Sequence, residues 1–147
     1  MTPIDERVRA VKADYEDCFG CGHNNPIGLQ LDGFSLEKGE VFASFTPREF
    51  YRGFEDVLHG GVLATALDEM LSWTAILEEG VFVLTGKLDL RFRNPAPVTE
   101  TYRLVGRVNE RRGRRLLISG ECRRADGEVV AEASGLFLVS REVDQAP

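Results

Sequence analysis

The sequence of 147 residues predicts an α+β fold, in which one long apolar helix is wrapped by a curved antiparallel β-sheet. Three features predict this arrangement. Residues 61–77 form a continuous apolar segment of helical length. Short segments with alternating apolar and polar residues come before and after it. Glycines recur inside the later segments, which indicates a bent sheet that a helix approaches closely.

The N-terminal part is predicted to contain a helix, a loop and a hairpin. Residues 4–14 indicate a short polar helix, and the loop at 16–28, EDCFGCGHNNPIG, is rich in Gly, Asn and Pro. Alternation begins at Leu29 and changes phase at Gly33, as it would at a β-bulge. Residues 41–45 alternate again, so we expect a hairpin whose apolar face is formed by Val41, Ala43 and Phe45.

The segment at 61–77 is apolar on nearly every side, which is typical of a helix that other structure encloses. Its polar residues share one face because they are three or four positions apart: Thr65, Asp68, Glu69 and Ser72. We therefore expect the two carboxylates to face a specific group.

Four further strands are predicted at residues 81–92, 101–109, 115–124 and 128–139, with a hairpin turn at Asp126 and Gly127. The order β-β-α-β-β-β-β is that of the hotdog fold. Alternation directs these side chains toward the helix: Leu84, Leu88, Leu90, Phe92, Leu104, Val108, Ile118 and Cys122. We expect three glycines on the same faces: Gly86, Gly106 and Gly120.

Composition indicates one domain over residues 1–147, in which residues 1–26 form an N-terminal helix and loop extension. No segment approaches the ~20 apolar residues of a membrane span, and no signal-peptide core is visible, so we expect a cytoplasmic protein. Three cysteines favour reduced thiols over disulfides. The net charge of -6 argues against nucleic-acid binding, although residues 87–124 carry eleven Lys and Arg against four Asp and Glu. This window offers either a surface for an anionic ligand or a solvated sheet face.

Three motifs resemble those of hotdog-fold acyl-CoA thioesterases of the phenylacetate-pathway (PaaI-like) group. The first is HGG with an aspartate nine residues after the histidine, from His59 to Asp68. The second is T-x-x-L-x-L-x-F-x-x-P, from Thr85 to Pro95. The third is the opening CFGCGHNNPIGLQL, which resembles one branch of the group. The resemblance extends from about residue 18 to residue 139.

The resemblance implies hydrolysis of an acyl- or aryl-CoA thioester. It assigns Asp68 as the general base or nucleophile and the Gly60 N–H as the donor to the carbonyl oxygen. A thiol with a pKa near ~8.5 leaves readily, so one base can suffice. We expect His59 to shape the loop, and Thr85 either to orient the water or to fill its strand. Some relatives have an asparagine where this sequence has Gly53, so polarisation of the carbonyl by that side chain is absent.

The spacing of the two assigned residues predicts a shared site. Gly60 and Asp68 are eight residues apart, which is roughly 12 Å along a helix. They therefore cannot both contact one carbonyl group within one chain. We expect Asp68 of one subunit to work with Gly60 of another across a two-fold axis. The resemblance likewise implies a homodimer, possibly paired again into a tetramer.

No cofactor and no metal are expected, because CoA is part of the substrate. The resemblance places CoA against the basic window, where guanidinium groups suit phosphates. The candidate CoA-binding residues are Gly61, Arg91, Arg93, Asn94, Arg111, Arg112, Arg114 and Arg115. We expect the acyl group to lie near Trp73, Ile76, Leu77 and Phe82.

Several other interpretations have weaker support. Cys18, Cys21 and His23 offer half of a zinc site, but structural zinc usually has four ligands. HNNPIG resembles the DxNPIH motif of hotdog enoyl-CoA hydratases, yet His23 and Gly28 stand where the acid and base would be. A GxSxG nucleophile elbow is absent. A non-catalytic acyl-CoA sensor is the remaining alternative, and an assay of thiol release distinguishes it from an enzyme.

Overall fold

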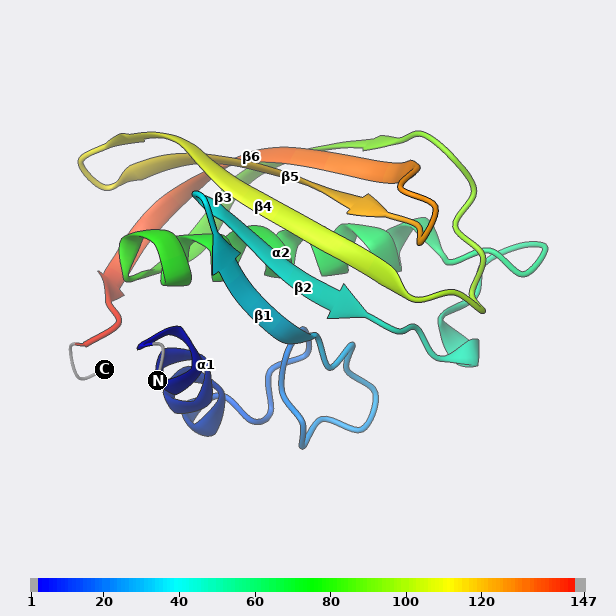
Figure 1. Ribbon diagram of the computed structural model, residues 1–147, viewed down its shortest axis with the longest axis horizontal. Coiled ribbons are helices and arrows are strands. Elements are labelled where there is room, and N and C mark those ends of the chain that lie inside the picture. The colour runs from blue at the N-terminus through cyan, green and yellow to red at the C-terminus, as the bar shows by residue number, and fades with distance from the viewer. Residues whose placement is uncertain (1–2, 145–147) are drawn as a thin grey trace.

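The computed structural model describes residues 3–144 and confirms the predicted order of elements (Figure 1). Their bounds are α1 Pro3–Asp14, β1 Asp32–Glu37, β2 Glu40–Phe45, the 3-10 helix η1 Glu49–Tyr51, α2 Gly60–Glu79, β3 Val81–Phe92, β4 Tyr102–Arg112, β5 Arg115–Arg123 and β6 Val129–Glu142. Over the described range, no helix is both long and apolar enough to cross a membrane. The single-domain organisation and the cytoplasmic location stay predictions.

The strands form one antiparallel sheet in the order β1-β2-β4-β5-β6-β3, and α2 packs along one face of it (Figure 1). The predicted α+β class is therefore confirmed. The core lies between this helix and the sheet, where Leu67, Met70 and Leu71 are fully buried. Burial of each such side chain stabilises the fold by about 1.5–3 kcal/mol. The predicted apolar face of the first hairpin is also confirmed, because Val41 and its neighbours at 43 and 45 are buried.

The central helix is slightly longer than the predicted 61–77 because residues outside the apolar segment cap it. His59 is the N-cap, in an extended conformation. Gly80 is the C-cap in the left-handed conformation, with φ of 67°, which glycine adopts without steric cost. The Gly80 N–H donates to the Ile76 carbonyl at 3.1 Å.

Two of the three strand glycines allow the close approach of α2 that the sequence predicts. A Cβ at Gly106 would lie 2.0 Å from Thr74 Oγ1, and one at Gly120 would lie 2.9 Å from Leu71 Cδ2. The prediction for Gly86 is wrong. A Cβ there would meet the carbonyl of Leu136 on β6, because Gly86 sits in a β-bulge.

The same bulge corrects the predicted inward face of β3. The register between β3 and β6 shifts between Thr85 and Lys87, so residues before and after the bulge differ in phase. Leu88 and Leu90 pack on the core as predicted, whereas Leu84 is 66% exposed. Uniform alternation cannot reveal a bulge in mid-strand, and Leu84 was therefore misplaced.

The first strand begins later than the predicted Leu29. Gln30 has a positive φ of 54°, which breaks the extended backbone, and β1 begins at Asp32. The bulge at Gly33 is confirmed by its φ of 69° and by the shifted register with β2. Leu29 and Leu31 are nevertheless buried. These two leucines are buried because the loop before β1 packs on the core, and they do not belong to a strand.

Candidate functional site

Asp68 and Thr85 form the first part of the candidate site. Asp68 lies in the middle of α2 and is partly exposed. Thr85 is paired with the fully buried Phe137, so its side chain points to the helix side of the sheet. The Thr85 hydroxyl donates to Asp68 Oδ1 at 2.7 Å. Within residues 3–144, Asp68 Oδ2 has no hydrogen-bond partner, so one carboxylate oxygen is positioned while the other is available.

The N-terminus of α2 forms the second part. The first four N–H groups of a helix have no acceptor within the helix itself. Here His59 satisfies three of them: its Nδ1 accepts from Gly61 N at 2.9 Å, and its carbonyl accepts from Val62 N at 3.0 Å and Leu63 N at 3.3 Å. The Gly60 N–H is left without an acceptor among the described residues. His59 thus shapes the helix start, as expected, and leaves one amide donor available.

The surroundings of Gly60 are open. The residue is exposed, and a Cβ at this position would lie 3.7 Å from the ring of Phe92, which is itself 55% exposed. Gly60 and Asp68 belong to one continuous helix, so the roughly 12 Å axial separation expected from the sequence applies. The structure brings Asp68 and Thr85 together but does not bring Gly60 to them within the chain.

The first group of predicted CoA-binding residues lies at the C-terminal end of β3 and just after it, at the end of α2 where Gly60 lies. Arg93 Nη2 is 2.5 Å from Glu132 Oε1, and both side chains are partly exposed. Asn94 Nδ2 donates to the Val129 carbonyl at 2.7 Å. The side chain of Arg91 makes no hydrogen bond or ion pair within residues 3–144, so its guanidinium is available to an anion, and it lies beside Asp89 on the side of the sheet away from α2.

The second group lies on the β4–β5 hairpin at the opposite end of α2. Arg111 Nη1 is 3.0 Å from an oxygen of Glu79, the last residue of that helix. Arg112 contacts the neighbouring Glu110 at 2.7 Å. Arg115 has no ion pair or hydrogen bond to the part of the chain that is described. Nineteen residues separate Gly60 from Glu79, roughly 28 Å along the axis, so one chain does not bring the two arginine groups together.

The remaining member of the second group is engaged with the backbone. Arg114 Nη2 donates to the carbonyl of Val139 on β6 at 2.8 Å. Its guanidinium thus holds the hairpin against β6, which leaves less of its hydrogen-bonding capacity for a ligand.

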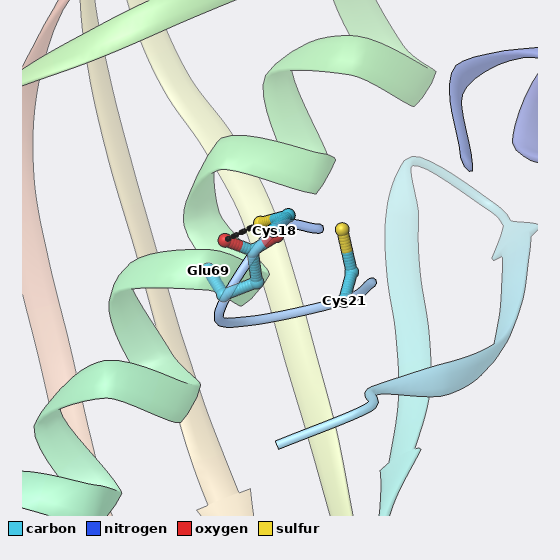
Figure 2. A group of neighbouring side chains, drawn as sticks. All are labelled: Cys18, Cys21 and Glu69. Atoms are coloured by element: carbon cyan, nitrogen blue, oxygen red, sulfur yellow. Dashed lines mark hydrogen bonds between the residues drawn. The ribbon is translucent and has the colours of Figure 1, made fainter. Parts of the chain in front are cut away.

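Glu69, next to the candidate base, points to a different environment. Trp73 Nε1 donates to Glu69 Oε2 at 3.1 Å, and Cys18 Sγ lies 3.7 Å and 3.8 Å from its two oxygens (Figure 2). Burial raises the pKa of Glu69 to about 7. A hydrogen bond from Cys21 lowers the pKa of the Cys18 thiol and raises that of Cys21 itself. The polar stripe of α2 therefore divides into an open part at Asp68 and an enclosed part at Glu69.

The residues beside the two cysteines differ from those that the sequence indicates as possible zinc ligands, which are Cys18, Cys21 and His23. His23 Nε2 lies 3.5 Å from Lys12 Nζ, away from the two thiols. Glu69, from a helix far along the chain, takes the third position beside Cys18 and Cys21. Its place in the polar stripe was visible in the sequence, but its contact with the N-terminal loop depends on the tertiary fold.

A cavity of about 330 Å³ lies beside the enclosed part of the stripe. Its lining includes Trp73, Ile76 and Phe82, as predicted for the acyl site. Leu77 does not line it, because this residue is buried in the core and its carbonyl accepts a hydrogen bond from Arg7. Leu77 is therefore not a wall of this cavity.

Comparison with known proteins gives a consistent picture. Residues 55–131 match the pattern of the thioesterase superfamily. Bovine acyl-coenzyme A thioesterase THEM4 is 30% identical over 122 residues, which is 82% of this chain and 50% of that protein. The chain spans about half the length of this curated relative. Bovine THEM4 is therefore the longer protein, and the match concerns one part of it.

Two solved structures show the same fold. The Escherichia coli PaaI protein from the phenylacetic acid degradation operon has a TM-score of 0.76 at 17% identity, covering 94% of this chain and 96% of its own. The protein smu.793 from Streptococcus mutans, solved with acetyl-CoA, has a TM-score of 0.72 at 18% identity, covering 82% and 96%.

Proposed function

Since this chain belongs to the thioesterase superfamily and has its hotdog fold, we propose that it hydrolyses the thioester bond of an acyl- or aryl-CoA. The observation that carries this proposal is the Asp68 carboxylate, which Thr85 holds by one oxygen while the other is available. The free Gly60 N–H at the start of the same helix supplies the second requirement of the reaction.

The chemistry requires an activated water and a donor for the developing negative charge. Asp68 Oδ2 accepts a proton from water, whose oxygen attacks the thioester carbonyl. The Gly60 N–H, at the positive end of the helix dipole, stabilises the negative oxygen. The C–S bond then breaks, and the leaving thiolate takes up a proton. Since such a thiol has a pKa near ~8.5, it departs without a dedicated acid.

Direct attack by Asp68 is the alternative route, and it gives an acyl-aspartyl anhydride instead. The hydrogen bond from Thr85 suits the base role, because it restricts the rotation of the carboxylate and holds it by one oxygen while the other is available. In a single turnover in 18O-enriched water, a water nucleophile places the label in the product acid and none in Asp68. Direct attack followed by hydrolysis at the aspartyl carbonyl places the label in Asp68, and a trapped acyl-enzyme would identify direct attack whichever carbonyl the water attacks.

The complete site requires two chains, because Gly60 and Asp68 are roughly 12 Å apart along α2. An open sheet edge supports such a dimer. Among the described residues, β3 pairs only with β6, so its other edge presents unpaired backbone groups together with the exposed Leu84 and Phe92. Two copies with their α2 helices antiparallel across a two-fold axis place Gly60 of each chain near Asp68 of the other.

The arginines at the two ends of α2 supply candidate contacts for the phosphates of CoA. Arg91 and Arg115 are the members whose guanidinium groups have no partner within the described chain. Arg93 and Arg111 would have to give up their ion pairs with glutamates in order to contact a phosphate, and such exposed ion pairs cost little to break. Because the two groups lie at opposite ends of the helix, each composite site draws them from different subunits or uses only one group.

The cavity beside Trp73 and Phe82 is the proposed acyl site. Its lining is mostly apolar but includes Glu69 and Arg141, and its volume of about 330 Å³ suits an aryl or medium-length alkyl group. The test is release of free thiol from a panel of acyl- and aryl-CoA esters, followed with a thiol-reactive dye. Catalytic release of CoA supports the proposal. Saturable binding without release would instead identify a non-catalytic acyl-CoA sensor.

A further inference from the structure

We propose that Cys18, Cys21 and Glu69 form a zinc-binding site that joins the N-terminal loop to the central helix. Their ligand atoms all lie within 4.8 Å of one another (Figure 2). The two cysteines come from the loop before β1 and the carboxylate from α2, so their convergence is a product of the tertiary fold. The proposed proton transfer and carbonyl contact use none of the three, although all three line the proposed acyl cavity.

The spacing of the donors fits tetrahedral zinc. With Zn–S near ~2.3 Å and Zn–O near ~2.1 Å, a tetrahedral angle separates the sulfur and oxygen by roughly 3.6 Å. The measured separations between Cys18 Sγ and the Glu69 oxygens are 3.7 and 3.8 Å. Cys18 and Glu69 therefore already stand at the separation that a shared ion would require, and the Cys21 sulfur lies within 4.8 Å of both donors.

The loop around the two cysteines forms a tight turn. The Gly22 N–H donates to the Cys18 carbonyl at 2.9 Å and closes the turn. A Cβ at Gly22 would lie 2.1 Å from the Glu16 carbonyl, so the tight turn requires glycine there.

Glycine also permits contact between the loop and the helix. A Cβ at Gly20 would lie 2.4 Å from the Glu69 Cδ atom, so a larger residue would displace the carboxylate from its present position or move the loop. The loop thus has one glycine that shapes the turn and another that admits the third ligand.

The charge balance of the cluster also favours a cation. Within residues 3–144, the side chain of Glu69 contacts Cys18, Cys21 and Trp73, and none of these is positively charged. Carboxylate and thiolate groups that lose contact with water are costly unless they are protonated or a cation compensates them. A divalent ion would compensate both groups at once.

The donor set selects zinc among the common divalent ions. Thiolates disfavour magnesium and calcium, and two sulfurs with one carboxylate suit the borderline-soft zinc ion. Three protein ligands leave a fourth position, which faces the cavity that Ser72 and Trp73 also line. Water or a small ligand would complete the coordination there.

The test uses the full-length protein in reduced, metal-free form, titrated with Co²⁺ as a spectroscopic probe and then with Zn²⁺. We expect one metal ion per chain, with a near-ultraviolet charge-transfer band from thiolate to cobalt and visible bands of tetrahedral intensity. Zn²⁺ should displace the Co²⁺ and protect two of the three cysteines from a thiol-reactive dye.

The matched variants locate the ligands. Cys18→Ala and Cys21→Ala should abolish the charge-transfer band, and Glu69→Gln should weaken binding by at least roughly tenfold, since even outer partners of metal ligands are worth that much. Cys122→Ala, which changes a buried cysteine on β5 outside the cluster, should bind like wild type. Asp68→Asn should also retain the metal, which separates this site from the proposed catalytic one.

Three outcomes would overturn the proposal. The first is the absence of a thiolate band in the wild-type titration, which requires no variant to fold. The second is metal binding that survives the Cys21→Ala change. The third is a reduced protein that binds no zinc although oxidation readily joins Cys18 to Cys21, which would identify the motif as a dithiol.

Discussion

Replacement of Asp68 by asparagine tests the proposed base with little disturbance of the fold. The amide has nearly the same shape, and its oxygen can still accept the 2.7 Å hydrogen bond from Thr85. The change therefore removes the basicity of the side chain while it preserves its position. Because Asp68 is partly exposed and has no ion pair within residues 3–144, the stability should change by no more than about 0.5 kcal/mol.

The expected loss of activity follows from the role of the base. General-base catalysis typically contributes ~10²–10⁴-fold, so kcat should fall by that factor. This loss corresponds to about 2.7–5.5 kcal/mol of transition-state stabilisation. KM for the CoA ester should stay within a few-fold of wild type, since the proposed CoA contacts lie elsewhere. The assay is thiol release under saturating substrate, alongside thermal unfolding of both proteins.

The matched control is Asp89→Asn on β3. Asp89 is exposed, and its carboxylate contacts Lys87 at 3.6 Å on the side of the sheet away from α2. Its replacement should leave kcat near wild type. If Asp68→Asn retained full turnover, or if both variants lost activity equally, Asp68 would not be the base.

Three further predictions concern the neighbours of the site and the core. Thr85→Val should lower kcat several-fold while Thr85→Ser retains most of it, because the hydroxyl positions Asp68; equal rates in the two variants would assign Thr85 to packing alone. Replacing Arg91 and Arg115 by alanine should raise KM for a CoA ester but not for a truncated thioester without phosphates; equal effects on both substrates would refute the phosphate contacts. Gly106→Ala should destabilise the protein by about 1–3 kcal/mol in denaturant unfolding, since the added methyl overlaps Thr74 Oγ1; an unchanged midpoint would show that the helix can move away.

The sequence predicts the elements of this fold well because their periodicity is a local property. The long apolar helix, the first hairpin and the inward faces of β4 and β5 all follow from it. The errors occur where the phase changes within an element. Gly86 and Leu84 were assigned to the helix side because the bulge after Thr85 has no unambiguous signature in one sequence.

The sequence predicts which residues belong to the candidate site better than it predicts which of them contact one another. The polar stripe and the HGG motif select Asp68 and Gly60, and their spacing on one helix already separates them. The sequence does not reveal that Thr85 contacts Asp68, because that contact depends on the register of β3. The enclosure of Glu69 by the cysteine loop likewise depends on a contact between segments about fifty residues apart.

Mixed dimers test the composite site most directly. Gly60→Pro removes the proposed N–H donor at low structural cost, because proline is favoured at the first position of a helix and the preceding His59 is already extended, with φ of -60° and ψ of 136°. In a hybrid of one Gly60→Pro chain and one Asp68→Asn chain, both defects fall in one composite site. The other site pairs an intact Asp68 with an intact Gly60 N–H.

The measurement is thiol release by purified hybrids that carry a different affinity tag on each chain, compared with the two mutant homodimers. We predict that both homodimers are inactive and that the hybrid regains up to half of the wild-type kcat. Well-folded hybrids that stay inactive, or a wild-type protein that is fully active as a monomer, would contradict the account. Asp68 would then have to act with a donor from its own chain.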